Sequence, residues 1–166
     1  MHDLLEQFFQ NARGRRQVAI EFLRFGLKVD QKAKIYVGNI ELPPAKIARA
    51  LGVDRRVVIE TAKASTKDDK LFHIFYKLEP RAFIGNAAKE LGFDVIELRA
   101  DPKKKGIVAG VTKVLADNNI VIRQVISDDP DLFPDPVLTI IIDGKLNANI
   151  IKKLRELDFA ESILIR

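Results

Sequence analysis

The turn from Asp101 to Gly106 carries residue types that suit a small zwitterionic ligand. Gly106 precedes an apolar helical segment, and the first turn of a helix offers unpaired N–H groups and a positive dipole end to a carboxylate. Glycine also lets a ligand approach the backbone closely. The lysines at 103–105 add positive potential, and Asp101 is placed to accept an ammonium group. The turn therefore predicts an amino-acid site; the alternative is that Asp101 caps the turn and the lysines are solvated.

A second group of residues, within 44–62, has the spacing of a helix-turn-helix. Ala48 is the small residue where two helices cross, Gly52 makes the turn four residues later, and Val58 is the buried position of the second helix. In this motif the second helix enters the major groove of DNA, where basic side chains contact phosphates or guanine edges. The alternative is a helix hairpin that binds no DNA and carries ordinary exposed charges. The predicted DNA contacts are Lys46, Arg49, Arg55, Arg56 and Glu60.

The charge distribution favours a polyanion partner for the first part of the chain. Residues 1–70 contain fourteen Lys and Arg against nine Asp and Glu, whereas residues 71–166 contain fourteen of each. The net formal charge of +5 therefore lies entirely in the first part. A basic part beside a neutral part indicates that the basic part meets a negatively charged partner.

Several classes of function are excluded by composition. The 166 residues include no cysteine, which excludes disulfides, thiol catalysis and Cys-ligated zinc. The two histidines form no pair, and we find no glycine-rich phosphate loop or nucleophile elbow. We therefore predict no enzyme, no catalytic or metal-binding residue and no cofactor. No apolar run approaches the roughly 18 to 20 residues that cross a bilayer, and no signal peptide is evident, so we expect a cytoplasmic protein without a membrane partner.

The elements that must position these residues follow from hydrophobic periodicity. Residues 3–25 have helical periodicity, with Gly14 expected to separate two helices, and a strand near Ile35–Val37 suggests a winged or hairpin-decorated helix-turn-helix. Leu71–Leu78 and Ala82–Leu91 are expected to be connecting helices. From residue 93 the periodicity alternates in the order strand, helix, strand, strand, helix, strand. Gln124 shares the parity of the apolar residues in its strand, so we expect a bulge or an interface there.

The predicted fold class is therefore α+β. An N-terminal helical helix-turn-helix domain (residues 1–67) and a helical connector (68–92) precede a ferredoxin-like βαββαβ domain (93–166). Right-handed crossovers place both helices of the last domain on one face of an antiparallel sheet.

Residues 93–166 resemble the ACT domain. Asp101 and Pro102 end the first strand, Gly106 opens the helix, and Asn118-Asn119 leads into a β-branched strand. In ACT domains turns of this type precede a helix, and small amino acids bind as effectors. This sequence departs from the pattern at Val121, where amino-acid-binding members often carry a polar residue such as asparagine, and its turn is longer. The ligand-binding residues that the resemblance implies are Asp101, Lys105, Gly106, Ile107, Asn118, Asn119 and Val121.

Both parts together resemble a family of prokaryotic proteins described as predicted regulators of amino acid metabolism, which join an N-terminal helix-turn-helix to a C-terminal ACT domain. The match includes Asp-Arg-Arg-Val-Val at 54–58 and Ile-Arg-Gln-Val-Ile at 122–126. The resemblance implies a DNA-binding transcriptional regulator that forms a homodimer through its ACT domain and responds to a small-molecule effector, an amino acid. The alternative function is a metabolite-sensing module for protein–protein interaction or dimerisation that does not bind DNA.

Overall fold

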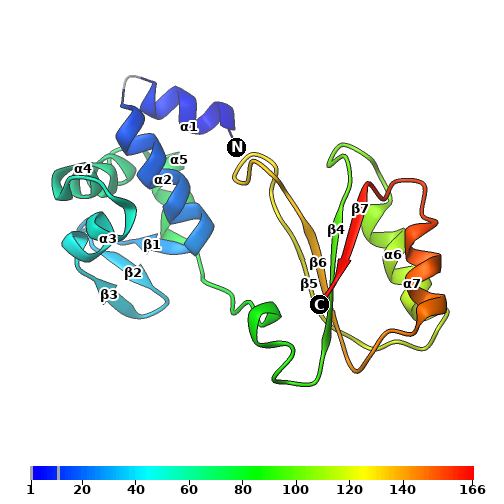
Figure 1. Ribbon diagram of the computed structural model, residues 1–166. Coiled ribbons are helices and arrows are strands. Elements are labelled where there is room, and N and C mark those ends of the chain that lie inside the picture. Colours follow the sequence, from blue (N-terminus) through cyan, green and yellow to red (C-terminus); the bar gives the residue numbers. More distant parts are fainter. Residues whose placement is uncertain (1, 11) are drawn as a thin grey trace. The chain divides into compact units, whose positions relative to one another are not determined.

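The structure, a computed structural model, describes the backbone of residues 2–10 and 12–166 and the side chains of residues 5–10 and 12–166. The chain divides into two compact units, residues 1–82 and 83–166, which we describe separately (Figure 1). Helices combine with two antiparallel sheets, so the predicted α+β class is confirmed. Among the described residues, no helix combines the length and the apolar character that crossing a membrane requires.

The first unit contains helices packed around a hydrophobic core that includes a pair of aromatic rings. Phe22 and Phe75 are fully buried and meet edge to face, with ring centroids 6.1 Å apart. The helices are α1 (His2–Phe9), α2 (Arg13–Phe25), α3 (Pro44–Leu51), α4 (Arg55–Ser65) and α5 (Asp69–Tyr76).

The break between the first two helices lies before Arg13, so the prediction that Gly14 separates them is wrong. Part of the expected first helix, residue 11, lies outside the described residues. Gly14 sits in the first turn of α2, where a Cβ atom would lie 3.4 Å from Val57 Cγ1 of α4. Close packing between the two helices has therefore outweighed the low helix propensity of glycine.

Three short strands form the sheet of the first unit. β1 (Leu27–Val29), β2 (Ile35–Val37) and β3 (Ile40–Leu42) pair antiparallel in that order. The strand expected near residues 35–37 is therefore present. All three strands precede α3 in the chain, so the sheet comes before the α3–α4 pair in the sequence and does not follow α4.

The chain passes close to the end of α2 as the first unit ends. Gly26 caps α2 in the left-handed conformation, with φ of 61°. A Cβ atom at this position would lie 2.6 Å from the carbonyl oxygen of Glu79 and 2.7 Å from the nitrogen of Pro80. Only glycine, which has no Cβ, leaves room for the segment at residues 79–80.

The second unit has the predicted βαββαβ order. Its elements are β4 (Asp94–Arg99), α6 (Ile107–Ala116), β5 (Ile122–Ser127), β6 (Leu138–Ile142), α7 (Ala148–Arg155) and β7 (Ser162–Ile165). The strand order β5-β6-β4-β7, with every neighbouring pair antiparallel, is that of a ferredoxin-like sheet. Both helices lie on one face of the sheet (Figure 1), and Leu115 and Leu154 pack there against Ile96 and Ile140. The fold prediction for this unit is confirmed.

A β-bulge interrupts β5 where Gln124 broke the apolar pattern. Ile122 pairs with Ile142 and Gln124 with Ile141, so Arg123 is an extra residue on β5. The bulge places Gln124 opposite Ile141, whose side chain faces away from α6 and α7. There the Gln124 Oε1 atom accepts a hydrogen bond of 3.2 Å from the backbone N–H of Ile84. The expected irregularity is confirmed, and it places Gln124 where it bonds a segment forty residues away in the chain.

The helix predicted over Ala82–Leu91 is wrong. This segment forms only the 3-10 turn η1 (Gly85–Ala87) and packs on the sheet face opposite the helices, where Ala88 is buried against Val95 and Ile141. An extended, turning path lets Ala88 reach the sheet, and Gly92 adopts φ of 80° to redirect the chain into β4. Of the two expected connecting helices, the first is present as α5, which belongs to the first unit, and the second is absent from the described segment.

Candidate effector and nucleic-acid sites

The second unit contains a cavity of about 420 Å³ at the end of the sheet where β4 and β5 finish. Leu98 and Ala100 form its floor, the first turn of α6 forms one wall, and the turn between β5 and β6 forms the other. The cavity lies on the helix side of the sheet, because Leu98 and Leu138 belong to the core beneath α6 and α7. The lining residues are Leu98, Ala100, Pro102, Lys104, Gly106, Ile107, Val108, Ala109, Ser127, Asp128, Pro130, Pro136, Val137 and Leu138.

Two of the predicted ligand-binding residues, Gly106 and Ile107, line this cavity. Gly106 adopts φ of 86° directly before α6, a conformation that favours glycine, and nothing lies within 4 Å of where a Cβ would be. The space beside the backbone at the start of α6 is therefore open, and ligand binding there stays a prediction.

Asp101 and Lys105 flank the cavity without lining it. The Asp101 Oδ1 atom accepts a hydrogen bond of 2.9 Å from the backbone N–H of Lys103, so this carboxylate stabilises its own turn. Lys104, rather than Lys105, is the lysine in the lining. Its Nζ atom lies 3.5 Å from Asp158 Oδ2 and donates to the Asp158 carbonyl at 3.3 Å.

Asn118, Asn119 and Val121 lie at the opposite end of α6. A helix of ten residues is about 15 Å long, so these residues cannot share one small ligand with Gly106 in the same unit. Asn118 caps the helix by donating to the Val114 carbonyl at 2.7 Å, and Lys153 donates to its Oδ1 at 3.1 Å. The structure therefore brings Gly106 and Ile107 together and separates the other three from them.

The wall formed by the turn between β5 and β6 was missed by the sequence reasoning. Asp128 closes this turn: its backbone N–H donates to the Val137 carbonyl at 3.1 Å, and its Oδ2 accepts from the Val137 N–H at 3.1 Å. Ser127 and Asp128 end β5 at the same edge of the sheet as the β4–α6 turn. The βαββαβ order was the available signal, because it places the two turns at one end of the sheet.

An ion pair holds the same turn to β4. Arg99 donates to both carboxylate oxygens of Asp135, from Nη2 at 2.8 Å and from Nε at 3.0 and 3.1 Å. Hydrogen bonds from Arg99 lower the pKa of Asp135, and the same bonds raise the pKa of Arg99. The pair fixes Asp135, the neighbour of the lining residue Pro136.

In the first unit, α3 and α4 form the helix pair expected from the sequence. Gly52 adopts φ of 65° between them, and the Val53 N–H donates to the Ala48 carbonyl at 3.0 Å. Asp54 starts α4 by accepting a hydrogen bond of 2.7 Å from the Arg56 N–H. Ala48 and Val58 are buried, as expected for the positions where the helices meet.

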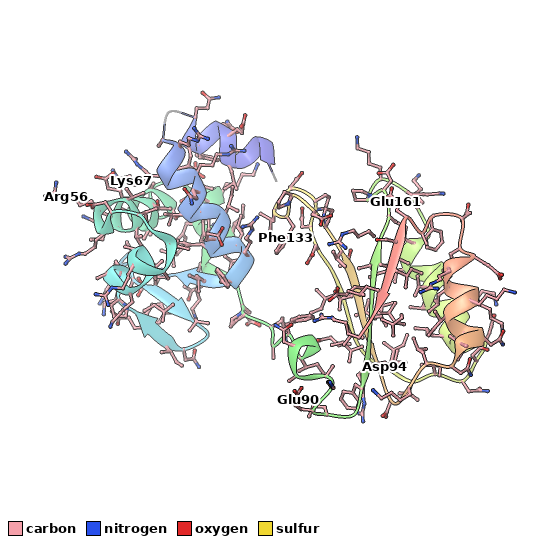
Figure 2. All side chains as sticks on the ribbon, viewed as in Figure 1. Arg56, Lys67, Glu90, Asp94, Phe133 and Glu161 are labelled. Carbon is pink, nitrogen blue, oxygen red and sulfur yellow. The ribbon has the colours of Figure 1, made fainter. Side chains whose placement is uncertain are left out.

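Basic side chains are exposed on both helices of this pair. Some other cations of the unit are paired: Arg24 lies 2.7 Å from Glu21, and Lys34 lies 2.9 Å from Glu41. Among the described residues, no ion pair involves the exposed side chains Lys46, Arg49, Arg55 and Arg56. Figure 2 shows Arg56 at the outer surface of α4.

Glu60, the one acidic residue predicted to contact DNA, forms an ion pair. Its Oε2 atom lies 3.3 Å from Nε of Arg15 on α2, and both side chains remain about half exposed. A role for Glu60 at a base edge stays a prediction.

Comparison with solved structures finds 13 matching chains, of which we describe two, both of low similarity. The ligand-free regulatory subunit of aspartate kinase from Thermus thermophilus is 20% identical over 46% of this chain, with a TM-score of 0.39, and the match spans about half of that protein (51%). The protein PH0061 is 14% identical over 75% of this chain and 78% of its own, with a TM-score of 0.28. No family model and no curated protein matches the chain. We assign the fold of the second unit from its strand order and pairing.

Proposed function

We propose that this protein is a DNA-binding transcriptional regulator whose second unit, of the ACT type, binds a small effector of amino acid metabolism. The observation that carries the proposal is the set of unpaired cations on α3 and α4. Lys46 and Arg49 lie on the first helix of the pair, and Arg55 and Arg56 lie at the start of the second. Cations that lack an internal partner keep their full charge for an external polyanion.

The position of Arg55 and Arg56 supports major-groove entry. In a helix-turn-helix the N-terminal residues of the second helix reach the base edges, and the first helix crosses the backbone. Arg55 and Arg56 occupy the first turn of α4, while Lys46 and Arg49 are exposed on α3. We therefore assign the two arginines to guanine edges or phosphates, and the two residues on α3 to phosphates.

The effector part of the proposal rests on the cavity. Its volume of about 420 Å³ lies within the range of about 300 to 1,000 Å³ that is typical of small-molecule sites. The open backbone at Gly106 and the apolar lining suit a metabolite. Homodimerisation through the second unit, which brings two helix pairs to two half-sites, completes the proposal.

Titration of a mixed-sequence DNA duplex at 50 and 200 mM salt tests DNA binding. We expect the affinity to fall steeply with salt, and the R55A/R56A double variant to bind more weakly with a slope reduced by about 1.8 if both arginines contact phosphates. The matched control is K103A/K105A, which removes the same charge from exposed lysines of the second unit. Absence of binding at 50 mM salt refutes DNA binding and leaves the protein-interaction alternative, whereas equal weakening by the two double variants refutes the assignment of the contact to α4.

A thermal-shift screen of the twenty amino acids at millimolar concentration tests the effector role. A ligand that binds only the folded protein raises its melting temperature. We expect at least one amino acid to stabilise the protein, with the stabilisation lost when the cavity is filled. A flat response to all twenty would contradict an amino-acid effector.

A further inference from the structure

We propose that the cavity selects the apolar body of its ligand, because each charged side chain in its lining already has a partner within the second unit. The ligand class is a small branched aliphatic compound with a single hydrogen-bonding group. This inference rests on the proposed effector role of the second unit and narrows the chemistry of that site.

The cavity is lined mainly by apolar side chains from three elements. Leu98 and Ala100 come from β4 and the turn after it, Ile107 comes from α6, and Val137 and Leu138 come from the start of β6. These groups gain free energy by covering apolar surface, and that gain scales with the area removed from water. A branched aliphatic body of on the order of ten non-hydrogen atoms fits a cavity of this size.

The charged side chains that could hold a zwitterion each have a partner within the second unit. The Asp101 carboxylate, the predicted partner of an ammonium group, lies outside the lining and accepts from Lys103. The one cation in the lining, Lys104, lies beside the Asp158 carboxylate. The one carboxylate in the lining, Asp128, accepts from the Val137 N–H and would repel a ligand carboxylate.

One polar side chain in the lining remains available. Ser127 ends β5 opposite Leu138 and is exposed, and its hydroxyl has no hydrogen-bond partner among the described residues. A hydroxyl can donate and accept, so it suits an alcohol or a carbonyl group on the ligand. Among the side chains of the lining, Ser127 thus offers one neutral polar contact, beside the open backbone at the start of α6 and a predominantly apolar surface.

A series of ligands with one shared aliphatic body tests this inference. The series is L-leucine, 4-methylpentanoate, which lacks the ammonium group, 3-methylbutylamine, which lacks the carboxylate, and 3-methyl-1-butanol, which is uncharged. Binding to the full chain is measured by NMR titration up to 20 mM of each. We expect the dissociation constants of 3-methyl-1-butanol and leucine to agree within a factor of about three.

Two substitutions on α6 locate the site. A109F places a ring at the cavity mouth, whereas A116F places the same ring at an exposed position at the far end of the helix. We expect A109F to raise the dissociation constant of the alcohol at least tenfold and A116F to change it less than twofold. S127A should raise it about two- to tenfold, the worth of one neutral hydrogen bond.

Each result decides between the inferences. Leucine binding at least ten times more tightly than the other three compounds overturns the apolar-body inference and leaves the effector proposal standing. Equal effects of A109F and A116F overturn the location. If none of the four compounds binds at 20 mM, the inference fails, and the screen of all twenty amino acids separately decides whether the effector proposal fails with it.

Discussion

The close approach of the chain to Gly26 makes a quantitative prediction about the first unit. In G26A the new Cβ would lie 2.6 Å from the Glu79 carbonyl oxygen and 2.7 Å from the Pro80 nitrogen, both backbone atoms that cannot move aside as a side chain end can. Holding alanine at φ of 61° costs about 1 to 2 kcal/mol by itself. Displacing packed backbone adds about 1 to 3 kcal/mol. We therefore expect G26A to lower the free energy of unfolding by about 2 to 5 kcal/mol.

Gly38 supplies the matched control. Its φ of 58° is nearly the same, but nothing lies within 4 Å of its Cβ position. G38A should therefore show only the backbone cost of about 1 to 2 kcal/mol. The difference between the two variants measures the contact with the segment at residues 79–80 alone.

Tyrosine fluorescence during urea unfolding reads out this experiment. The chain has two tyrosines and no tryptophan, and both tyrosines, Tyr36 and Tyr76, lie in the first unit. The signal therefore follows the unit that contains the substitution. A difference between G26A and G38A below about 0.5 kcal/mol would refute the reasoning, because it is no larger than that of an ordinary surface substitution.

Three further changes test the second unit. Hydrogen bonds from Arg99 lower the pKa of Asp135, so the pair stabilises the fold above the ordinary aspartate pKa of about 3.9. D135N should therefore destabilise the protein at pH 7. The difference from wild type should vanish as the pH falls below about 3.9 and through the lowered pKa of Asp135. Q124L removes the acceptor of the Ile84 N–H, and hydrogen exchange at that amide should accelerate while exchange in β4 stays slow. L154A deletes a fully buried side chain beneath the sheet and should cost about 2 to 5 kcal/mol in thermal unfolding followed by circular dichroism. Unchanged exchange at Ile84, or a pH-independent effect of D135N, would contradict the corresponding contact.

The fold of the second unit could be predicted because its signals are local. The three isoleucines at 140–142 mark a strand buried on both faces, and Asn147 is a helix cap that the structure confirms by its hydrogen bond of 2.9 Å to the Ile150 N–H. The segment at 82–91 failed for the opposite reason. Ala88 is held by Val95 and Ile141, contacts that no helical periodicity encodes.

The candidate site was harder to predict because its parts are distant in the sequence. Gly106 was found from a local turn signal, whereas Asp128 reaches the same cavity only through the pairing of β5 with β6. Asn118 was joined to Gly106 through a resemblance, although a helix about 15 Å long separates them within one unit. Spacing along the chain does not reveal which end of an element a residue occupies in the completed sheet.

The bulge at Arg123 also affects what can happen at the rim of the sheet. β5 is an outermost strand, and a straight strand in that position is a template on which another chain can extend the sheet without limit. The extra residue bends β5 and disrupts its regular spacing of backbone donors and acceptors, so a regular run remains only from Gln124 to Ser127. An added strand would find a short docking length there, which permits a closed pair of copies and disfavours continued growth into aggregates. The bulge that places Gln124 beside Ile84 thus also disfavours edge-to-edge pairing along β5.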